Sequence, residues 1–163
     1  MSFLPVPSLM LDSIYELKPE RLNELGICLL LLDLDNTMAE YSASTPTVHL
    51  RNWLDSLKKA HIEPFILSNN RGSRPAAFAK ALQLDFIGHA RKPNPKTLLT
   101  VLKSKGVKPE NAAIIGDQIY TDILCGARAG VFSIAVKPMS LAHPLRFLRY
   151  GIEMPFRLIY RRK

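Results

Sequence analysis

Short apolar runs that stop at polar residues recur along this chain. They cover residues 27–32, 64–67, 112–115 and 131–136. A continuous apolar run of this length is typical of a strand buried on both faces, as in a parallel sheet. We therefore predict four such strands, with a further brief strand around residues 85–87.

Segments with helical character separate these runs. Apolar spacing and helix-boundary residues predict helices over 18–25, 46–60, 73–82, 94–105 and 119–129. Gly26, Gly106 and Gly130 are suited to end three of them, because glycine readily takes the left-handed conformation that follows a helix. Strands that alternate with helices predict an α/β fold, a Rossmann-like three-layer sandwich with a parallel sheet.

The segment after Pro138 departs from this alternation. We predict a core over residues 1–137, with a lead-in helix near its start, and a basic amphipathic tail over residues 138–163. Pro144 and Pro155 are expected to break the tail. Its apolar residues at helical spacing are Leu141, Leu145, Leu148 and Ile152.

More than half of the net charge lies in this tail. The whole chain carries 22 Lys+Arg against 14 Asp+Glu, a net charge of +8. Two interpretations of the tail are open: it lies in the interface of an anionic membrane, or it packs on its own domain with its arginines facing water. Its basic residues, set against the acidic Glu153, are Arg146, Arg149, Arg157, Arg161, Arg162 and Lys163.

The composition is that of a single globular domain of 163 residues, 47% of them hydrophobic. Cys28 and Cys125 are far apart in apolar surroundings, which predicts small buried side chains rather than a disulfide or a zinc site. No apolar run is long enough to span a bilayer, and the first ten residues lack the leading positive charge of a secretory signal. A cytoplasmic protein is expected, with peripheral contact at the inner face of the membrane if the tail lies in the interface.

Candidate catalytic residues stand at the ends of four predicted strands. Open α/β sheets place their chemistry just beyond the carboxyl ends of strands, and buried carboxylates are unfavourable unless a metal or a reaction uses them. Carboxylates, a hydroxyl and an ammonium suit phosphoryl transfer through an aspartyl-phosphate, with Mg²⁺ to neutralise the phosphate charge. The residues, in strand order, are Asp33, Asp35 and Thr37, then Ser68 and Asn69, then Lys92, then Asp117 and Asp122.

Each of these residues also has a purely structural interpretation. Ser68 and Asn69 could begin a turn, and Lys92 could be a solvated surface lysine. Asp122 could be a first-turn carboxylate favoured by the helix dipole. The ordered occurrence of all four groups at four strand ends favours an enzyme.

From residue 27 to residue 136 the sequence resembles the haloacid dehalogenase-like (HAD) phosphatases. The resemblance implies that Asp33 is the nucleophile, that Asp35 is the general acid and base, and that Thr37 steadies the loop. The matching motifs are Asp33-Leu34-Asp35-Asn36-Thr37, then Ser68, then Lys92 in Arg91-Lys92-Pro93, then Gly116 to Asp122.

The same resemblance implies a set of ligands for phosphate and metal. Mg²⁺ is expected on the Asp33 carboxylate, the Asp35 main-chain carbonyl and Asp117. Asp122 is expected to support the site by holding a metal-bound water or Lys92, which itself balances charge around the nucleophile. The phosphate-binding residues implied are Thr37, Ser68, Asn69 and Lys92.

The intervals between the motifs leave no room for the cap domain that many HAD enzymes carry. One helix occupies much of the interval between Thr37 and Ser68, and one helix with a short strand fills the interval from Ser68 to Lys92. We therefore expect no cap and an open site. Such a site suits a lipid headgroup or a macromolecule, or a cap borrowed from a second subunit; the sequence predicts no particular oligomeric state.

The motif details are similar to the uncapped subfamily IIIA of the YqeG type, whose eukaryotic relatives include phosphatidylglycerophosphate phosphatases. Met38 is a small departure, because Leu is commoner there. We predict a Mg²⁺-dependent phosphomonoester hydrolase that converts phosphatidylglycerophosphate to phosphatidylglycerol. The alternatives are a phosphatase of a soluble sugar or nucleotide monophosphate, a phosphoacceptor switch, or an RNA-associated adaptor. Asp35 is suited to activating water, which disfavours a switch, and the sequence lacks any recognised nucleic-acid-binding motif.

Overall fold

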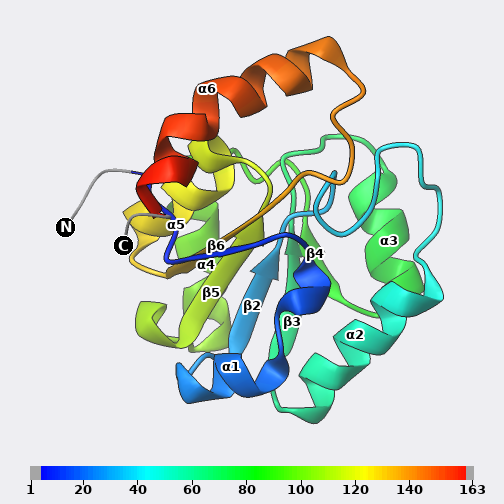
Figure 1. Ribbon diagram of the computed structural model, residues 1–163. Helices are drawn as coiled ribbons and strands as arrows, with labels where there is room; N and C mark the ends of the chain where they lie inside the picture. The colour runs from blue at the N-terminus through cyan, green and yellow to red at the C-terminus, as the bar shows by residue number, and fades with distance from the viewer. Residues whose placement is uncertain (1–4, 161–163) are drawn as a thin grey trace.

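The computed structural model describes residues 5–160 and contains a six-stranded parallel sheet (Figure 1). The strand order is β1-β6-β5-β2-β3-β4, and every neighbouring pair is parallel. The predicted α/β fold with a parallel sheet is therefore confirmed. The strands are β1 (Leu9–Leu11), β2 (Leu29–Leu32), β3 (Glu63–Leu67), β4 (Asp85–Ile87), β5 (Ala112–Gly116) and β6 (Phe132–Val136).

Helices cover both faces of the sheet and form the outer layers of the sandwich. Successive side chains of a strand point to opposite faces, so β2 contributes to two separate cores. Leu30 and Leu32 pack with residues of α1 and α2, whereas Leu29 and Leu31 pack with residues of α4 and α5. The helices are α1 (Pro19–Glu24), α2 (Val48–Lys59), α3 (Arg74–Leu82), α4 (Lys96–Lys105), α5 (Leu124–Ala129) and α6 (Pro144–Tyr160).

Most predicted helix ends agree with the structure to within two residues. Gly106 and Gly130 follow α4 and α5 in the left-handed conformation, with φ of 65° and 74°, as expected for glycine C-caps. The predicted helix over 119–129 is divided into a π-helical turn, η3 (Ile119–Ile123), and α5. This turn begins two residues after Asp117 and carries Asp122 to the edge of the sheet.

Two segments differ from the sequence prediction. Strand β1, which was not predicted, is a short, half-buried edge strand whose partner β6 lies far along the chain, so no local pattern marks it. Helix α6 continues through Pro155 where a break was expected. Buried Glu153 and Arg157 lie on either side of Pro155 and hold both parts of the helix against the core, which outweighs the hydrogen bond that proline removes.

The two cysteines also differ from each other. Cys125 is buried, as predicted, and burial raises the pKa of its thiol to about 12. Cys28 is exposed, contrary to the prediction. It lies just before β2 begins, where the chain is still at the surface.

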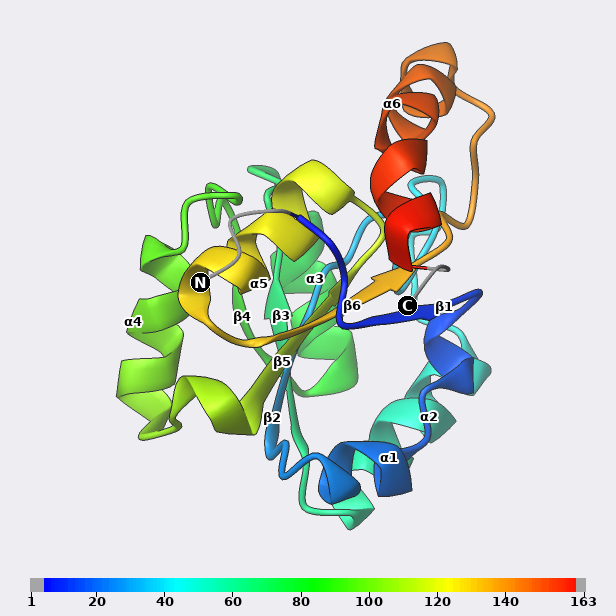
Figure 2. The ribbon, with the colours of Figure 1, turned by 60° about the vertical axis from the view of Figure 1, so that its left-hand side comes forward.

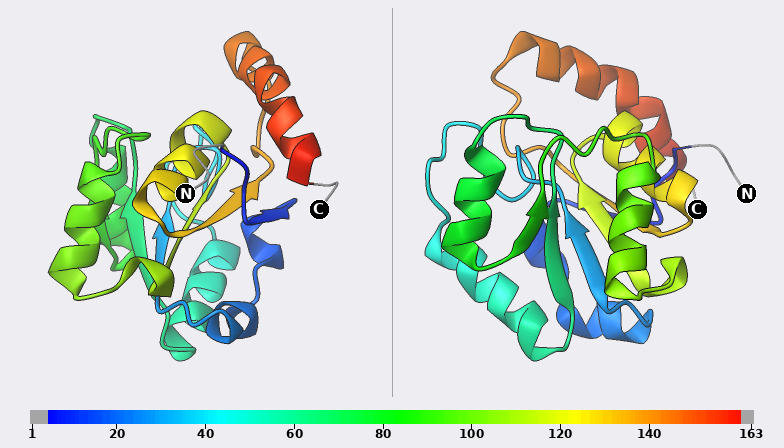
Figure 3. Two further views of the ribbon diagram at one scale, coloured as in Figure 1. Left: turned by 90° about the vertical axis from the view of Figure 1, so that its left-hand side faces the viewer. Right: turned by 180° about the vertical axis from the view of Figure 1, so that it is seen from behind.

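Helix α6 lies outside the sheet, on the side of β6 and β1 (Figures 1, 2 and 3). It contacts β1 and η3. Within residues 5–160, no helix is both long enough and apolar enough to cross a membrane. The division of the chain into a core and a tail stays a prediction, and Arg161, Arg162 and Lys163 lie outside the described residues.

No cap domain interrupts the fold between β2 and β5. The interval from β2 to β3 contains α2, and the interval from β3 to β5 contains α3, β4 and α4. The prediction of an uncapped chain is confirmed. In the described part of the chain, the carboxyl edge of the sheet is therefore covered by loops, by η3 and by α6.

Candidate active site

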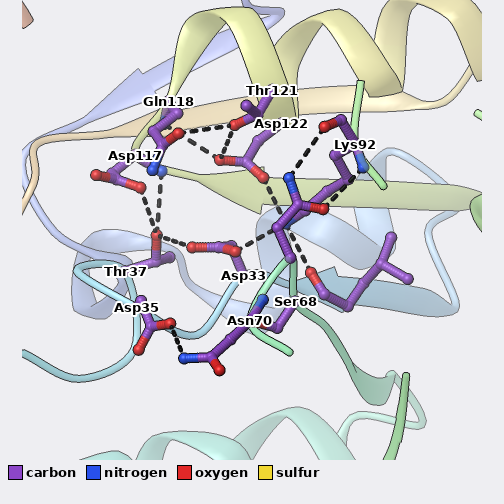
Figure 4. A network of polar contacts seen from close by, with 12 residues as sticks. Asp33, Asp35, Thr37, Ser68, Asn70, Lys92, Asp117, Gln118, Thr121 and Asp122 are labelled. Carbon is purple, nitrogen blue, oxygen red and sulfur yellow. Dashed lines mark hydrogen bonds and ion pairs between the residues drawn. The ribbon is translucent and has the colours of Figure 1, made fainter. Parts of the chain in front are cut away.

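The predicted candidate residues meet at the carboxyl edge of the sheet (Figure 4). Asp33 follows β2, Ser68 follows β3 and Asp117 follows β5. Parallel strands end at the same edge, which explains why residues so distant in sequence converge there. Those that are buried are Asp33, Asp35, Thr37, Ser68, Lys92, Asp117 and Asp122.

Lys92 is the central cation of this cluster. Its ammonium donates hydrogen bonds to Oδ1 of Asp33 at 2.7 Å, to Oδ1 of Asp122 at 2.6 Å, and to the carbonyl oxygen of Leu67 at 2.7 Å. Burial disfavours the charged form, but the carboxylates of Asp122 and Asp33 outweigh it and raise the pKa of Lys92. Lys92 is therefore a fixed positive charge beside Asp33.

Thr37 joins two of the carboxylates. Its hydroxyl lies 3.2 Å from Oδ2 of Asp33 and 3.4 Å from Oδ1 of Asp117, and it accepts a 3.0 Å hydrogen bond from the main-chain N–H of Asp117. The hydroxyl has a single hydrogen, so it donates to one carboxylate at a time. Thr37 thereby holds the loop after β2 against the loop after β5.

Three buried carboxylates come close enough together to hold a metal ion. One oxygen each from Asp33, Asp117 and Asp122 lie within 4.8 Å of one another. Burial raises the pKa of Asp33 to about 7, with Lys92 opposing the shift and Asp122 adding to it. Burial and the charges of Asp33 and Asp122 likewise raise the pKa of Asp117. The site thus contains more buried negative charge than Lys92 can balance.

These donors fit a hard divalent cation such as Mg²⁺, which prefers oxygen ligands. The three carboxylates are not equally available to it. Asp122 already accepts from Lys92 through Oδ1, and from the main-chain N–H of Gln118 and the hydroxyl of Thr121 through Oδ2. Asp33 and Asp117 are therefore the better candidates for direct ligands, in line with the roles expected for them.

Asp35 is held by two residues that the sequence analysis did not identify. Its Oδ1 accepts a 2.7 Å hydrogen bond from Nε of Arg74, and its Oδ2 accepts a 2.9 Å hydrogen bond from Nδ2 of Asn70. Arg74 also donates to the carbonyl oxygens of Glu40 and Ala43. Asn70 adjoins the Ser68-Asn69 motif and could have been suspected, whereas nothing local marked Arg74.

Asn69, for which phosphate binding was expected, contacts the main chain of Lys92 in the structure. Its side-chain amide forms a reciprocal pair with the main chain of Lys92, with Nδ2 donating to the carbonyl at 2.9 Å and Oδ1 accepting from the N–H at 2.8 Å. Asn69 thereby fixes the loop that carries Lys92, and its Nδ2 retains a second hydrogen for a further acceptor. Ser68 is buried, and its hydroxyl accepts from the main-chain N–H of Asn70 at 3.1 Å.

A cavity of about 460 Å³ opens onto these groups. Its floor includes Asp33, Ser68 and Lys92, and its lining also includes Tyr120 from η3 and Arg149 from α6. The cavity is therefore formed by the sheet edge together with the C-terminal helix. A small phosphorylated group fits this volume beside the nucleophile candidate.

Comparisons with known proteins agree with this geometry. The HAD-hydrolase-like family model matches residues 89–138. The chain is 34% identical to the probable phosphatase YqeG of Bacillus subtilis over 135 residues, which cover 83% of this chain and 78% of that protein. The aligned stretch covers more than two thirds of both chains, and this relative is itself described as a probable phosphatase.

Solved structures show the same fold at low sequence identity. A HAD superfamily (subfamily III A) hydrolase from Legionella pneumophila matches with a TM-score of 0.52 and 15% identity, covering 78% of this chain and 73% of that one. The 3-deoxy-D-manno-octulosonate 8-phosphate phosphatase of Moraxella catarrhalis, in complex with magnesium and phosphate ions, matches with a TM-score of 0.53 and 17% identity, covering 83% and 91%. The chain therefore belongs to the HAD-like hydrolases and is a phosphatase of that family.

Proposed function

We propose that this phosphatase is a Mg²⁺-dependent phosphomonoester hydrolase that acts through a phosphorylated Asp33. The observation that carries the proposal is the position of Asp33, which faces the cavity with its Oδ1 2.7 Å from the ammonium of Lys92. A carboxylate in this position can attack phosphorus while Lys92 balances the charge of the phosphoryl oxygens. Bound Mg²⁺ supplies further neutralisation of phosphate charge.

Two displacement steps account for hydrolysis. In the first, a carboxylate oxygen of Asp33 bonds to phosphorus, the ester P–O bond breaks, and the leaving oxygen takes a proton from Asp35. In the second, Asp35 removes a proton from water, whose oxygen bonds to phosphorus and releases the Asp33 carboxylate and inorganic phosphate. Asn70 and Arg74 fix the position of Asp35, and Ser68 is placed to hydrogen-bond a phosphoryl oxygen.

For the substrate we propose a lipid phosphomonoester, phosphatidylglycerophosphate. The observation that favours it is the polarity of α6. Leu145, Leu148 and Ile152 recur on one face of this helix and are 67%, 61% and 55% exposed, while Glu153 and Arg157 are buried on another face. A helix on a water-soluble domain normally has the opposite arrangement, with its apolar side inward.

An apolar helix face beside the active-site cavity suits the surface of an anionic membrane. Phe147, Leu158 and Ile159 are also exposed on α6. Together these side chains form an exposed apolar surface of the kind that marks an interaction site. The chain's net charge of +8 favours anionic lipids, so we place the membrane contact on this face of α6.

The activity is tested by phosphate release from the purified full chain with Mg²⁺. Phosphatidylglycerophosphate in mixed micelles is compared with soluble sugar and nucleotide monophosphates, using wild type, Asp33→Asn and the exposed-site control Asp55→Asn. We expect hydrolysis by wild type and Asp55→Asn, preference for the lipid, and no turnover by Asp33→Asn. Turnover of soluble esters alone would discard the lipid substrate, and a long-lived aspartyl-phosphate would indicate a phosphoacceptor switch instead.

The membrane contact is tested separately with vesicles. Ile152→Glu places a charge on the apolar face of α6, and Val48→Glu places the same charge at a 72% exposed position on α2. We expect Ile152→Glu to weaken cosedimentation with anionic vesicles and Val48→Glu to leave it unchanged. Equal binding by both variants would contradict a contact through α6.

A further inference from the structure

One cationic side chain of the active-site cavity has no role in the chemistry described above. Arg149 of α6 lines the same cavity of about 460 Å³ as Asp33 and Lys92. It is the contribution of the C-terminal helix to a cavity otherwise built on the loops of the sheet edge. A ligand that reaches Asp33 therefore enters a space that also adjoins Arg149.

The other charged residues of this cavity are already paired. Lys92 contacts Asp33 and Asp122, and Asp35 contacts Arg74. Arg149, by contrast, is exposed and forms no hydrogen bond or ion pair with any residue of the part of the chain that the structure describes. Glu153 is one turn along α6 at the spacing that suits an ion pair, but it pairs with Arg157 instead.

The helix that carries Arg149 is fixed relative to the catalytic loops. Arg157 is buried, and it donates hydrogen bonds to the main-chain carbonyls of Asp117 and Val136. Tyr120 of η3 packs edge-on against Phe156 of α6, with ring centroids 5.5 Å apart. These contacts hold α6 against the segment that follows β5, and thereby keep the helix that carries Arg149 beside the cavity that Asp33 also lines.

We propose that Arg149 binds a second anionic group of the substrate while Asp33 receives the phosphomonoester. This inference rests on the proposed function, because it concerns the same cavity. An arginine offers a planar, permanently charged fork that matches phosphate and carboxylate oxygens. Binding energy from a remote anion can also help to position the reacting phosphate.

The substrate class that follows is a phosphomonoester with a second anion a few bonds away. A phospholipid whose phosphodiester is joined to the phosphomonoester through a short polyol, such as phosphatidylglycerophosphate, has this chemistry. So does a soluble bisphosphate. A lipid with one phosphate, or a soluble monophosphate without a second anion, does not.

The test measures kcat/KM for two matched pairs of substrates. The soluble pair is propane-1,3-diol bisphosphate and 3-hydroxypropyl phosphate, and the lipid pair is phosphatidylglycerophosphate and phosphatidic acid in mixed micelles. Wild type, Arg149→Gln and Arg149→Lys are compared with Arg21→Gln, which removes an exposed arginine of α1. For each enzyme the readout is the ratio of kcat/KM within a pair.

We expect wild type and Arg21→Gln to prefer the doubly anionic member by at least tenfold, equivalent to about 1.4 kcal/mol. Arg149→Gln should lose most of this preference. Arg149→Lys should keep part of it, because lysine retains the positive charge but lacks the planar guanidinium that can donate two parallel hydrogen bonds. A preference within the lipid pair would identify a phospholipid as the source of the second anion, and a preference within the soluble pair would identify a soluble bisphosphate.

Two results would overturn the inference. If wild type hydrolyses both members of each pair equally well, or if Arg149→Gln keeps the full preference, the Arg149 subsite is wrong while the phosphatase mechanism stands. If wild type hydrolyses none of the four esters in the presence of Mg²⁺, the proposed function is wrong and the subsite falls with it.

Discussion

Nη2 of Arg157 lies 2.5 Å from the main-chain carbonyl oxygen of Asp117, so a hydrogen bond joins the C-terminal helix to the carboxylate cluster. The same guanidinium donates to the carbonyl of Val136 at 3.3 Å and pairs with Glu153 at 3.4 Å. Both charged side chains are almost completely buried. The position of α6 and the geometry of the Asp117 loop are therefore coupled.

Arg157→Met is expected to lower the free energy of unfolding by about 3–5 kcal/mol, because it leaves Glu153 buried without its partner. The double variant Arg157→Met/Glu153→Leu should recover much of this loss, since it removes both charges. Urea denaturation of the two variants measures the difference. A double variant less stable than the single one would contradict the role of the buried pair.

Gly116→Ala is expected to abolish most of the activity and to destabilise the fold by about 1–3 kcal/mol through overpacking. A Cβ at Gly116 would lie 2.3 Å from Cγ of Asp122, and Asp122 could not move without disturbing Lys92. Phosphate release and thermal melting measure the two effects.

The control for that substitution is Gly151→Ala on α6, where a Cβ meets nothing within 4 Å. There the substitution should stabilise the protein by about 0.5–1 kcal/mol, because alanine is favoured over glycine inside a helix. Equal melting temperatures and activities for the two variants would show that Asp122 can move to accommodate a methyl group at position 116, which would contradict the prediction.

Arg74→Gln is expected to reduce kcat for an alkyl phosphate by roughly tenfold or more, because Asp35, the proposed general acid, loses the partner that fixes its position. The loss for p-nitrophenyl phosphate should be smaller, since its leaving group needs little protonation. Arg51→Gln is the control, because Arg51 also donates to a main-chain carbonyl, that of Ala81, but lies outside the cavity. Equal losses for both esters would indicate that Arg74 acts on something other than the leaving group.

The stability of the metal-free protein should fall as the pH rises from 5.5 to 7.5. The pKa of Asp33 is raised in the folded state from its ordinary 3.8 to about 7, and that of Asp117 is also raised. Between pH 3.8 and about pH 7 the Asp33 carboxyl is more protonated in the folded state than in the unfolded state. Deprotonation of the folded state therefore favours unfolding. Thermal melts in EDTA at the two pH values measure the change, and Asp33→Asn should flatten it.

Mg²⁺ should reverse this dependence, because its carboxylate ligands must be deprotonated to bind it. We expect the rise in melting temperature on addition of Mg²⁺ to be larger at pH 7.5 than at pH 5.5. An equal rise at both pH values would argue against binding at the buried carboxylates.

The sequence was sufficient to predict the parts of the site that depend on strand ends. The apolar run before Asp33 and the polar residues after β3, β4 and β5 fix where the strands stop, and parallel pairing brings those ends together. Arg74 reaches Asp35 only because α3 packs beside the loop after β2, a tertiary relationship that no local pattern encodes. For the same reason β1, whose pairing with β6 spans most of the chain, was not predicted.

The orientation of α6 was beyond sequence reasoning as well. The spacing of Leu145, Leu148 and Ile152 correctly indicates one helical face, although Leu141, which was predicted to share it, precedes α6. Periodicity does not say whether that face points inward. Two buried charged residues on the opposite side decide it, and their burial depends on the carbonyls of Asp117 and Val136. Sequence periodicity identifies the apolar face of a helix, whereas the tertiary contacts of the helix decide which face is buried.

Asp33, the proposed nucleophile, follows β2, which has strands on both sides, whereas Arg149 lies on the helix that follows β6, the neighbour of the edge strand β1. The proposed roles thus place chemistry and substrate choice in different parts of the chain. Changes in α6 that spare Glu153, Phe156 and Arg157 are expected to alter which molecules are accepted without disturbing bond cleavage. The arrangement makes this phosphatase a suitable starting point for directed evolution of its substrate range, with the mutations confined to a single helix.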